Sequence, residues 1–310
     1  MSTVDPGTVG PATEAPGPGA TADGSAGPAP GDPPTLVVDR VSASYGPYRA
    51  LFGVSFTVPA GGVVALLGSN GAGKSTVARV VSGLLPVTGG RIVLQGRDVT
   101  GLPAYKIARA GMAHVVEGRG VFANLTVAEN LTLAFRQRLG RDQVDDCLER
   151  AYESFPVLGE RRRQRGGTLS GGQQRLLSLA KVLVAPPKLL VADELSLGLA
   201  PVVIDAVYDS LRRIHEAGTA LLVVEQQVDR VLEVADCAVV LEHGSVAFDG
   251  DATGALKAVE RVLAARGEVV AAMAVEGLEQ SAAERTDERP ERRRRWSRRG
   301  KNRSTGEEQG

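Results

Sequence analysis

The chain has 310 residues, of which 43% are hydrophobic and 23% charged, enough apolar material for one globular domain with a substantial core. No apolar run reaches the roughly 18–20 residues of a membrane span, and the N-terminus has neither the basic nor the apolar region of a signal peptide. These features exclude the integral membrane and secreted classes, and we expect a cytosolic protein that reaches a membrane only through a partner. The formal net charge is zero, but ten basic residues against three acidic ones fall within 285–303.

Both ends of the chain are predicted to be disordered tails. Residues 1–34 are almost all Gly, Pro, Ala, Ser, Thr and Asp, which offer no apolar surface to offset the entropy of ordering. Residues 278–310 are polar and rich in Arg, with Trp296 among them. This second tail is either solvated or a weak tether to anionic lipid or nucleic acid. Cys147 and Cys237 have no metal-type spacing, and we expect buried thiols rather than a disulfide.

Order is expected to begin near residue 35, and strand-like and helix-like segments then alternate along the chain. Buried strands are predicted at 62–68, 188–194 and 219–226, each with a helix after it, at 76–85, 201–218 and 228–236. Residues 91–99 indicate a strand and a turn, and 237–250 indicate a hairpin that turns at His243 and Gly244. Buried strands alternating with helices favour an α/β fold with a mostly parallel sheet covered on both faces. Residues 126–155 are amphipathic and helical without a strand signal, which indicates a helical insert in this core.

A phosphate-binding loop is predicted at 68–76. The sequence GSNGAGKST fits G-x-x-x-x-G-K-[ST] and stands between a buried strand and a helix, as this loop requires. The glycines let backbone N–H groups turn toward a β-phosphate, Lys74 would reach the β- and γ-phosphates, and the Ser75 hydroxyl would hold Mg²⁺. The residues predicted to bind ATP here are Gly68, Ser69, Asn70, Gly71, Ala72, Gly73, Lys74, Ser75 and Thr76.

Two acidic residues end the buried strand KLLVADE at 188–194. Asp193 would emerge at the carboxyl edge of the sheet, where α/β proteins bind ligands, and would hold the Mg²⁺. Glu194 would orient an attacking water as general base. The alternative for Asp193 is a helix cap or a surface acid, and adjacent acids are also common at strand ends.

A second anion-binding turn is predicted at LSGGQQR, residues 169–175, ahead of an apolar helical run. The phosphate loop, this turn and LLVADE, in this order and spacing, resemble the ATP-binding subunit of ABC transporters over about residues 35–265. The resemblance implies a P-loop NTPase (RecA-like) core with an antiparallel β edge and an inserted α-helical subdomain at about 118–168, within an ATPase domain at 35–277. It also implies that Ser170, Gly171, Gly172 and Gln173 close over the ATP held by a second subunit, so that ATP joins the two.

Further residues follow from the resemblance by position. Tyr45 resembles the aromatic residue that stacks on adenine; the alternative is a Tyr in the core or at its rim. Glu117 stands where the family usually has Gln and would bind Mg²⁺ or water; otherwise it is a solvated loop acid. Gln226 stands where most of the family has a histidine near the γ-phosphate; it can donate a hydrogen bond but has no titrating proton, which leaves the base role to Glu194. Phe122 faces either the permease groove or the core of the insert.

The strings VVEGRGVF, DELSLGLAP and VVEQQ are similar to the branch of the family that takes up branched-chain amino acids. The resemblance implies an ATPase in a hetero- or homodimer with a second ABC ATPase subunit, peripheral on the inner face of the membrane through transmembrane permease subunits. An external solute-binding protein would act indirectly, and no direct nucleic-acid binding is expected.

Other functions remain open from the sequence alone. Urea and amide uptake proteins have similar strings. A soluble ABC ATPase acting on nucleic acid is favoured only by the Arg-rich tail, because about fifty residues between Glu117 and Leu169 are too few for a coiled-coil arm. A weakly hydrolysing regulatory subunit is favoured by Glu117, Gln226 and Ala200, and opposed by Glu194.

Overall fold

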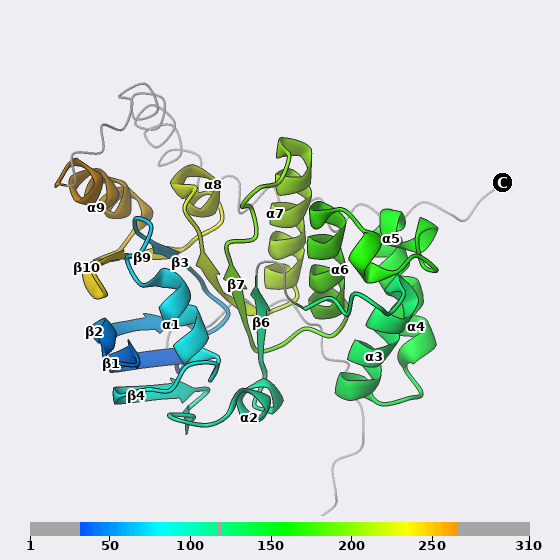
Figure 1. Ribbon diagram of the computed structural model, residues 1–310, viewed down its shortest axis with the longest axis horizontal. Helices are drawn as coiled ribbons and strands as arrows, with labels where there is room; N and C mark the ends of the chain where they lie inside the picture. Colours follow the sequence, from blue (N-terminus) through cyan, green and yellow to red (C-terminus); the bar gives the residue numbers. More distant parts are fainter. Residues whose placement is uncertain (1–31, 117–119, 266–310) are drawn as a thin grey trace, which may run out of the picture.

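A computed structural model describes residues 32–116 and 120–265 and places them in two sheets with helices between and around them (Figure 1). The order of strands is β2-β1-β4-β5 in one sheet and β10-β9-β3-β8-β7-β6 in the other. No helix in the described part of the chain is long and apolar enough to cross a bilayer.

The six-stranded sheet carries the predicted buried strands. β3 (Val63–Leu67), β7 (Leu189–Asp193) and β8 (Ala220–Val224) are buried at every residue. They run parallel to one another and to β6 (Met112–Val116) and β9 (Cys237–Glu242). β10 (Ser245–Gly250) is antiparallel to β9, and the predicted turn between them has positive φ at His243 (47°) and Gly244 (76°). The expected α/β fold with a mostly parallel sheet is therefore confirmed.

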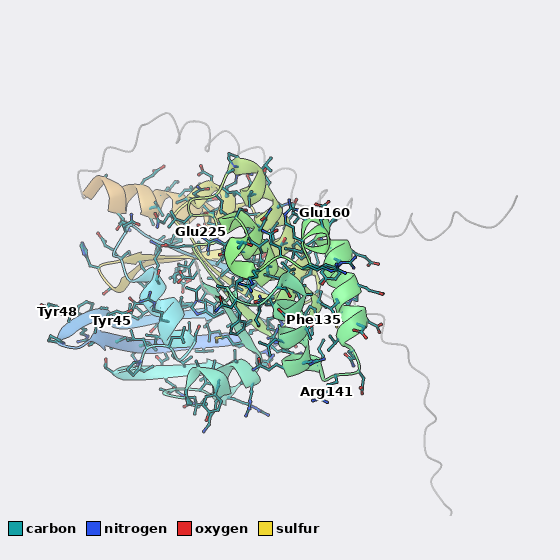
Figure 2. The ribbon with its side chains drawn as sticks, turned by 45° about the vertical axis from the view of Figure 1, so that its right-hand side comes forward. Tyr45, Tyr48, Phe135, Arg141, Glu160 and Glu225 are labelled. Carbon is teal, nitrogen blue, oxygen red and sulfur yellow. The ribbon has the colours of Figure 1, made fainter. Side chains whose placement is uncertain are left out.

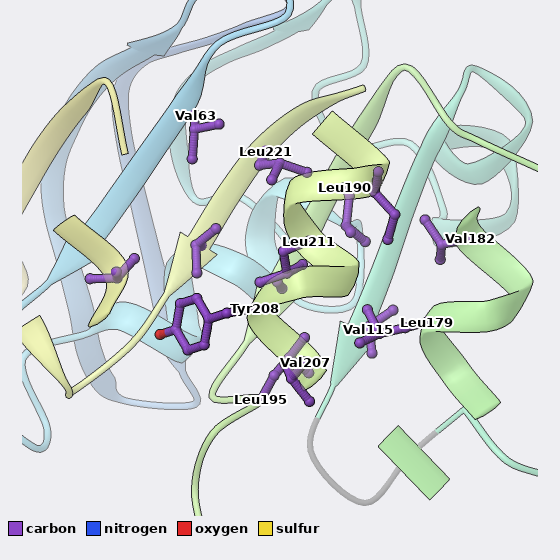
Figure 3. Packing of buried hydrophobic residues seen from close by; sticks show 14 of the residues in the cluster. Val63, Val115, Leu179, Val182, Leu190, Leu195, Val207, Tyr208, Leu211 and Leu221 are labelled. Carbon is purple, nitrogen blue, oxygen red and sulfur yellow. The ribbon is translucent and has the colours of Figure 1, made fainter. Parts of the chain in front are cut away.

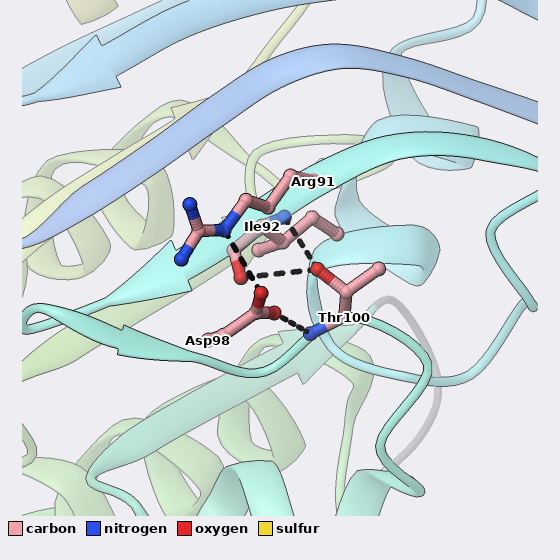
Figure 4. Close-up of polar contacts among 4 residues, drawn as sticks. All are labelled: Arg91, Ile92, Asp98 and Thr100. Carbon is pink, nitrogen blue, oxygen red and sulfur yellow. Dashed lines mark hydrogen bonds and ion pairs between the residues drawn. The ribbon is translucent and has the colours of Figure 1, made fainter.

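The second sheet is antiparallel and forms the β edge of the fold. It contains β1 (Leu36–Tyr45), β2 (Tyr48–Val58), β4 (Gly89–Leu94) and β5 (Arg97–Asp98). Polar contacts hold the β4–β5 hairpin: Arg91 Nε donates to Asp98 Oδ2 at 2.8 Å, and the Asp98 Oδ1 atom accepts from the Thr100 N–H at 2.9 Å (Figure 4). The Thr100 hydroxyl accepts the Ile92 N–H at 2.9 Å, so the strand and the chain beyond the hairpin are joined directly.

Two apolar clusters pack against opposite faces of the parallel sheet. Along β8, Leu222 and Val224 face the cluster that includes the antiparallel sheet and α1 (Lys74–Val81), whereas Leu221 and Val223 face the other cluster. The second cluster includes Leu179 of α6 (Gly171–Val184) and residues of α7 (Pro201–Glu216) such as Leu211 (Figure 3). Because side chains alternate along a strand, a strand covered on both faces is apolar throughout, which is why these strands were recognisable in the sequence.

The predicted helical insert contains α3 (Val127–Leu139), α4 (Val144–Ser154) and α5 (Pro156–Glu160), which gather beside α6 (Figure 1). A capping box begins α3: the Thr126 side chain accepts the Glu129 N–H at 3.2 Å, and Glu129 Oε2 accepts the Thr126 N–H at 2.7 Å. Phe135 of α3 is fully buried in the insert (Figure 2).

Some elements differ from the sequence-based expectations. α2 (Ala104–Arg109) and α9 (Ala252–Ala265) were not anticipated, and α8 (Val228–Leu232) ends four residues before the helix predicted to reach 236. The tail at 278–310 and most of the tail at 1–34 lie outside the described residues. Cys147 is buried and Cys237 is partly buried, and no disulfide joins them.

Candidate active site

The phosphate loop adopts a conformation that its glycines make possible. Gly68, Gly71 and Gly73 have φ of 143°, 77° and 106°, a region that other residues rarely enter. A Cβ on Gly68 would lie 2.4 Å from the Leu241 carbonyl oxygen, and one on Gly73 would lie 3.0 Å from Leu51 Cδ2. The loop therefore packs closely against its neighbours. It leads directly into α1, whose N-terminal N–H groups attract anions.

Lys74 is folded back onto this loop. Its Nζ donates to the carbonyl oxygens of Gly68 (2.9 Å) and Ser69 (3.2 Å), and the residue is only 4% exposed. Burial lowers the pKa of Lys74, and the nearby carboxylates of Glu194, Asp193 and Glu225 oppose that shift. A buried ammonium that donates to carbonyl oxygens is suited to meet phosphate oxygens.

Two side chains whose oxygen atoms could bind a metal ion lie beside the loop. The Ser75 hydroxyl donates to Asp193 Oδ1 at 3.3 Å, which joins the start of α1 to the end of β7. Burial and then the Glu194 charge raise the pKa of Asp193, while the Ser75 hydrogen bond and the cations Arg79 and Lys74 lower it. Hydroxyl and carboxylate oxygens are the ligands that Mg²⁺ prefers, so this pair fits a magnesium ion.

His114 of β6 is a neighbour of Asp193 that the sequence analysis did not single out. Its Nε2 lies 4.0 Å from Asp193 Oδ2. Burial lowers the pKa of His114 to about 4, so the imidazole is neutral at pH 7 and the contact is not an ion pair.

Glu194 begins the loop that leaves β7. Its φ is 50°, an unusual left-handed conformation for a residue with a side chain, and its N–H donates to the Val224 carbonyl oxygen at 2.9 Å. Gln226 Nε2 donates to Glu194 Oε1 at 3.0 Å. The structure therefore brings together the two residues predicted to act in hydrolysis.

A cleft of 540 Å³ opens over the phosphate loop. It contains six of the predicted phosphate-site residues and Glu194, and its other lining residues come from β2 and the β9–β10 turn. The lining residues are Arg49, Ala50, Phe52, Asn70, Gly71, Gly73, Lys74, Ser75, Thr76, Glu194, His243 and Gly244. Hydrogen bonds from Phe52 N to Gly244 O and from Gly244 N to Ala72 O, both 2.9 Å, bring these segments together.

Arg49, Phe52 and His243 were missed by sequence reasoning. The Arg49 guanidinium carbon lies 4.9 Å from the centre of the Phe52 ring, so a cation and an aromatic face line one wall of the cleft. Tyr45, the expected adenine contact, does not line the described cleft. It is 40% exposed at the end of β1, and its hydroxyl accepts a hydrogen bond from Arg79 Nη1 at 3.3 Å (Figure 2).

The predicted second turn starts α6. Ser170 is the N-cap: its Oγ accepts the Gln173 N–H at 3.3 Å, and Gln173 Oε1 accepts the Ser170 N–H at 3.1 Å. Gly172 is required by packing, because a Cβ there would lie 2.6 Å from Val203 Cγ1 of α7. Neither Ser170 nor Gly171 lines the described cleft at the phosphate loop. Glu117 lies outside the described residues.

A glycine loop leading into a helix, a buried lysine and an aspartate at the end of β7, one strand removed from β3, define a P-loop nucleoside-triphosphatase site. The ABC transporter family model matches residues 51–196. The chain is 41% identical over 213 residues to the high-affinity branched-chain amino acid transport ATP-binding protein BraG of Pseudomonas aeruginosa, covering 68% of this chain and 90% of that protein.

Other relatives show how wide the likeness is. The probable branched-chain amino acid transport ATP-binding protein LivF of Archaeoglobus fulgidus is 34% identical (70% of this chain, 92% of that protein), and the lipopolysaccharide export system ATP-binding protein LptB of Escherichia coli is 30% identical (72% and 93%). A crystal structure of a nucleotide-free ATP-binding cassette from an ABC transporter superposes with a TM-score of 0.63 at 25% identity, covering 74% of this chain and 95% of that one.

The chain belongs to the ABC transporter family of ATP-binding subunits. It is an ATPase, and it resembles the branched-chain amino acid branch of that family.

Proposed function

We propose that the protein is the ATP-hydrolysing subunit of an ABC importer that takes up a small solute, namely branched-chain amino acids. The observation that carries this proposal is the 41% identity to BraG across 90% of that protein, together with an assembled P-loop site. LptB, at 30% identity, serves export of a different substrate, so the solute has to be tested directly.

Within the proposed site, the glycine-loop N–H groups and Lys74 bind the phosphates of ATP. Ser75 and Asp193 hold Mg²⁺, and Glu117 is the expected further ligand. A Mg²⁺ ion held there would supply positive charge beside the phosphoryl oxygens. Tyr45 stays a proposed adenine contact.

Glu194 is the proposed general base. Its carboxylate orients and deprotonates the attacking water, and the Gln226 amide holds one carboxylate oxygen in place. Gln226 contributes a hydrogen bond and no titrating proton, so it is a partner for Glu194 rather than a second base.

The remaining half of each site comes from a second ATPase subunit, identical or different. Ser170, Gly171, Gly172 and Gln173 are proposed to close over the γ-phosphate that Lys74 of the other subunit holds, because α6 presents a helix N-terminus away from its own phosphate cleft.

Permease subunits are proposed to dock at about residues 117–135, of which the structure describes 120–135, at the cytoplasmic face of the membrane. Phe122 in this segment is 56% exposed, which supports the groove-facing alternative over burial in the insert. An external solute-binding protein would act through the permease, and no direct contact with nucleic acid is proposed.

Uptake measurements test this function. Deleting the gene should abolish high-affinity uptake of radiolabelled leucine, isoleucine and valine, and the wild-type gene should restore it, whereas Lys74→Ala and Glu194→Gln should not. Unchanged uptake of all three amino acids in the deletion strain would contradict the proposed solute, and urea uptake measured in parallel identifies the nearest alternative.

A further inference from the structure

Glu225 is a buried carboxylate next to the proposed site to which no role has been assigned. It follows β8 directly and is only 3% exposed (Figure 2). Its Oε1 accepts the Ser196 N–H at 3.0 Å, and its Oε2 accepts the Ser196 hydroxyl at 2.7 Å and the Gln226 N–H at 3.4 Å. Burying a carboxylate is costly unless several donors surround it, and here both oxygens have donors.

These hydrogen bonds join two loops that carry the hydrolytic residues. Ser196, itself 2% exposed, stands two residues after Glu194 in the loop that leaves β7. Gln226 follows Glu225 in the loop that leaves β8. Three contacts therefore join the two loops. The Glu194 N–H donates to the Val224 carbonyl oxygen, the Gln226 amide donates to the Glu194 carboxylate, and the buried pair described above is the third.

The conformation of Glu194 makes such a tie necessary. A residue with a side chain at φ 50° is in a sparsely populated backbone conformation, and it stays there only where its surroundings hold it. The Glu225–Ser196 pair fixes the chain just beyond Glu194, and the Glu225 contact to the Gln226 N–H fixes the backbone that carries the amide facing Glu194.

We infer that Glu225 is a positioning residue for ATP hydrolysis: through Ser196 and Gln226 it holds the Glu194 carboxylate in its reactive orientation. The inference rests on the proposed role of Glu194 as general base. Glu225 does not line the cleft over the phosphate loop, so its removal should affect turnover much more than nucleotide binding.

The test compares variants of the full-length chain in the assembly in which the wild type turns over ATP. Glu225→Ala should lower kcat about tenfold or more while KM for ATP changes less than about threefold. Glu225→Gln, which keeps one acceptor and can donate to the Ser196 hydroxyl, should recover most of that loss. Ser196→Ala should lower kcat less, and the double variant Glu225→Ala with Ser196→Ala should be no slower than Glu225→Ala alone.

Thr219→Val is the matched control. Thr219 directly precedes β8, at the end of the strand opposite to Glu225. It is fully buried, and its Oγ1 donates to the Pro187 carbonyl oxygen at 2.9 Å. Its loss also removes a buried hydrogen bond, but kcat per folded molecule should stay within about twofold of wild type.

Three results would overturn the inference: kcat within about twofold of wild type in Glu225→Ala, an equal loss in Thr219→Val, or fully additive losses in the double variant. If Glu225→Ala does not fold, an unchanged kcat in Ser196→Ala overturns it instead. Glu194→Gln separates the two hypotheses, because wild-type turnover in that variant refutes the base itself, whereas loss of turnover there with an active Glu225→Ala refutes only the positioning role.

Discussion

The side-chain amide of Gln226 donates a hydrogen bond to the carboxylate of Glu194, with 3.0 Å between Nε2 and Oε1. The two residues stand 32 positions apart, but they follow neighbouring parallel strands that pair Asp193 with Val224. A fixed amide can orient a carboxylate without competing with it for a proton, which defines what substitutions at 226 should do.

Gln226→Ala should lower kcat about tenfold with little change in KM, because the base stays but loses its orienting donor. Gln226→His keeps a donor and adds a group that titrates near neutral pH. Its kcat should acquire a pH-dependent step around pH 6–7 that the wild type lacks. Steady-state ATPase assays from pH 5.5 to 9 measure both effects, and a wild-type rate in Gln226→Ala would contradict the role of this hydrogen bond.

Glu194→Gln should lower the hydrolysis rate by about 10²–10⁴-fold while ATP still binds, since the amide keeps the shape of the carboxylate but cannot accept the proton. With turnover blocked, an Mg–ATP-bound dimer should accumulate, formed either by two copies of this chain or by this chain and its partner ATPase. Size-exclusion chromatography with light scattering measures this. Failure to assemble with either subunit would contradict the shared-site arrangement, and Lys74→Ala in the same experiment is the control with weakened ATP binding.

Much of this site could be predicted from the sequence, because local patterns determine it. The glycines that need positive φ, the lysine and the start of α1 all lie within 68–76. β7 is apolar up to Asp193 and β8 is apolar at every position, because both faces of these strands are covered. The start of α6 was equally readable, since Ser170 and Gln173 form a capping box within four residues.

The rest of the cleft depends on contacts between distant segments. Phe52 and His243 line it because backbone hydrogen bonds join β2, the phosphate loop and the β9–β10 turn, and no local pattern records that contact. The Gln226–Glu194 and Glu225–Ser196 pairs likewise depend on β7 and β8 being adjacent, and the order of strands in a sheet is not contained in either strand alone.

Ser170 allows the helix cap to be separated from the proposed contact with ATP. Ser170→Ala should lower the free energy of unfolding by about 1 kcal/mol, because the Gln173 N–H loses its acceptor. Ser170→Asp keeps an equally good cap and should be as stable as wild type, but its charge would face the γ-phosphate of the partner's ATP. Urea unfolding and ATPase assays should therefore rank the two variants in opposite orders. Wild-type turnover in Ser170→Asp would contradict the contact.

Lys74→Ala should weaken ATP binding by about 10–100-fold. The substitution removes the ammonium group that, when ATP binds, would exchange its two hydrogen bonds to carbonyl oxygens for hydrogen bonds to phosphate. Lys106→Ala, which removes an exposed lysine of α2 and changes the net charge equally, is the control and should bind as wild type does. Titration with a fluorescent ATP analogue measures both. Equal affinities in the two variants would show that charge at position 74 is not what binds the phosphates.

Lys181 should make stability depend on alkaline pH. Its Nζ donates to the Gly120 carbonyl oxygen at 2.7 Å and to Asn130 Oδ1 at 3.2 Å, and burial lowers its pKa from 10.5 to about 8. Between pH 8 and pH 10.5 Lys181 is protonated in the unfolded chain but neutral in the folded one, so its contribution to stability rises with pH. Below pH 8 the buried side chain is charged, and its destabilising effect on the folded state is complete.

Relative to Lys181→Met, the wild-type free energy of unfolding should therefore gain about 2 kcal/mol between pH 7.5 and 9.5. Titrating groups that both proteins share cancel when the two free energies of unfolding are subtracted. The two hydrogen bonds lost in Lys181→Met shift its curve of stability against pH by a constant amount and do not change its slope. The exposed Lys106→Met variant is the control and should follow the wild-type curve. Urea denaturation at half-unit pH intervals measures the difference, and a constant offset between wild type and Lys181→Met across this range would contradict a lowered pKa at Lys181.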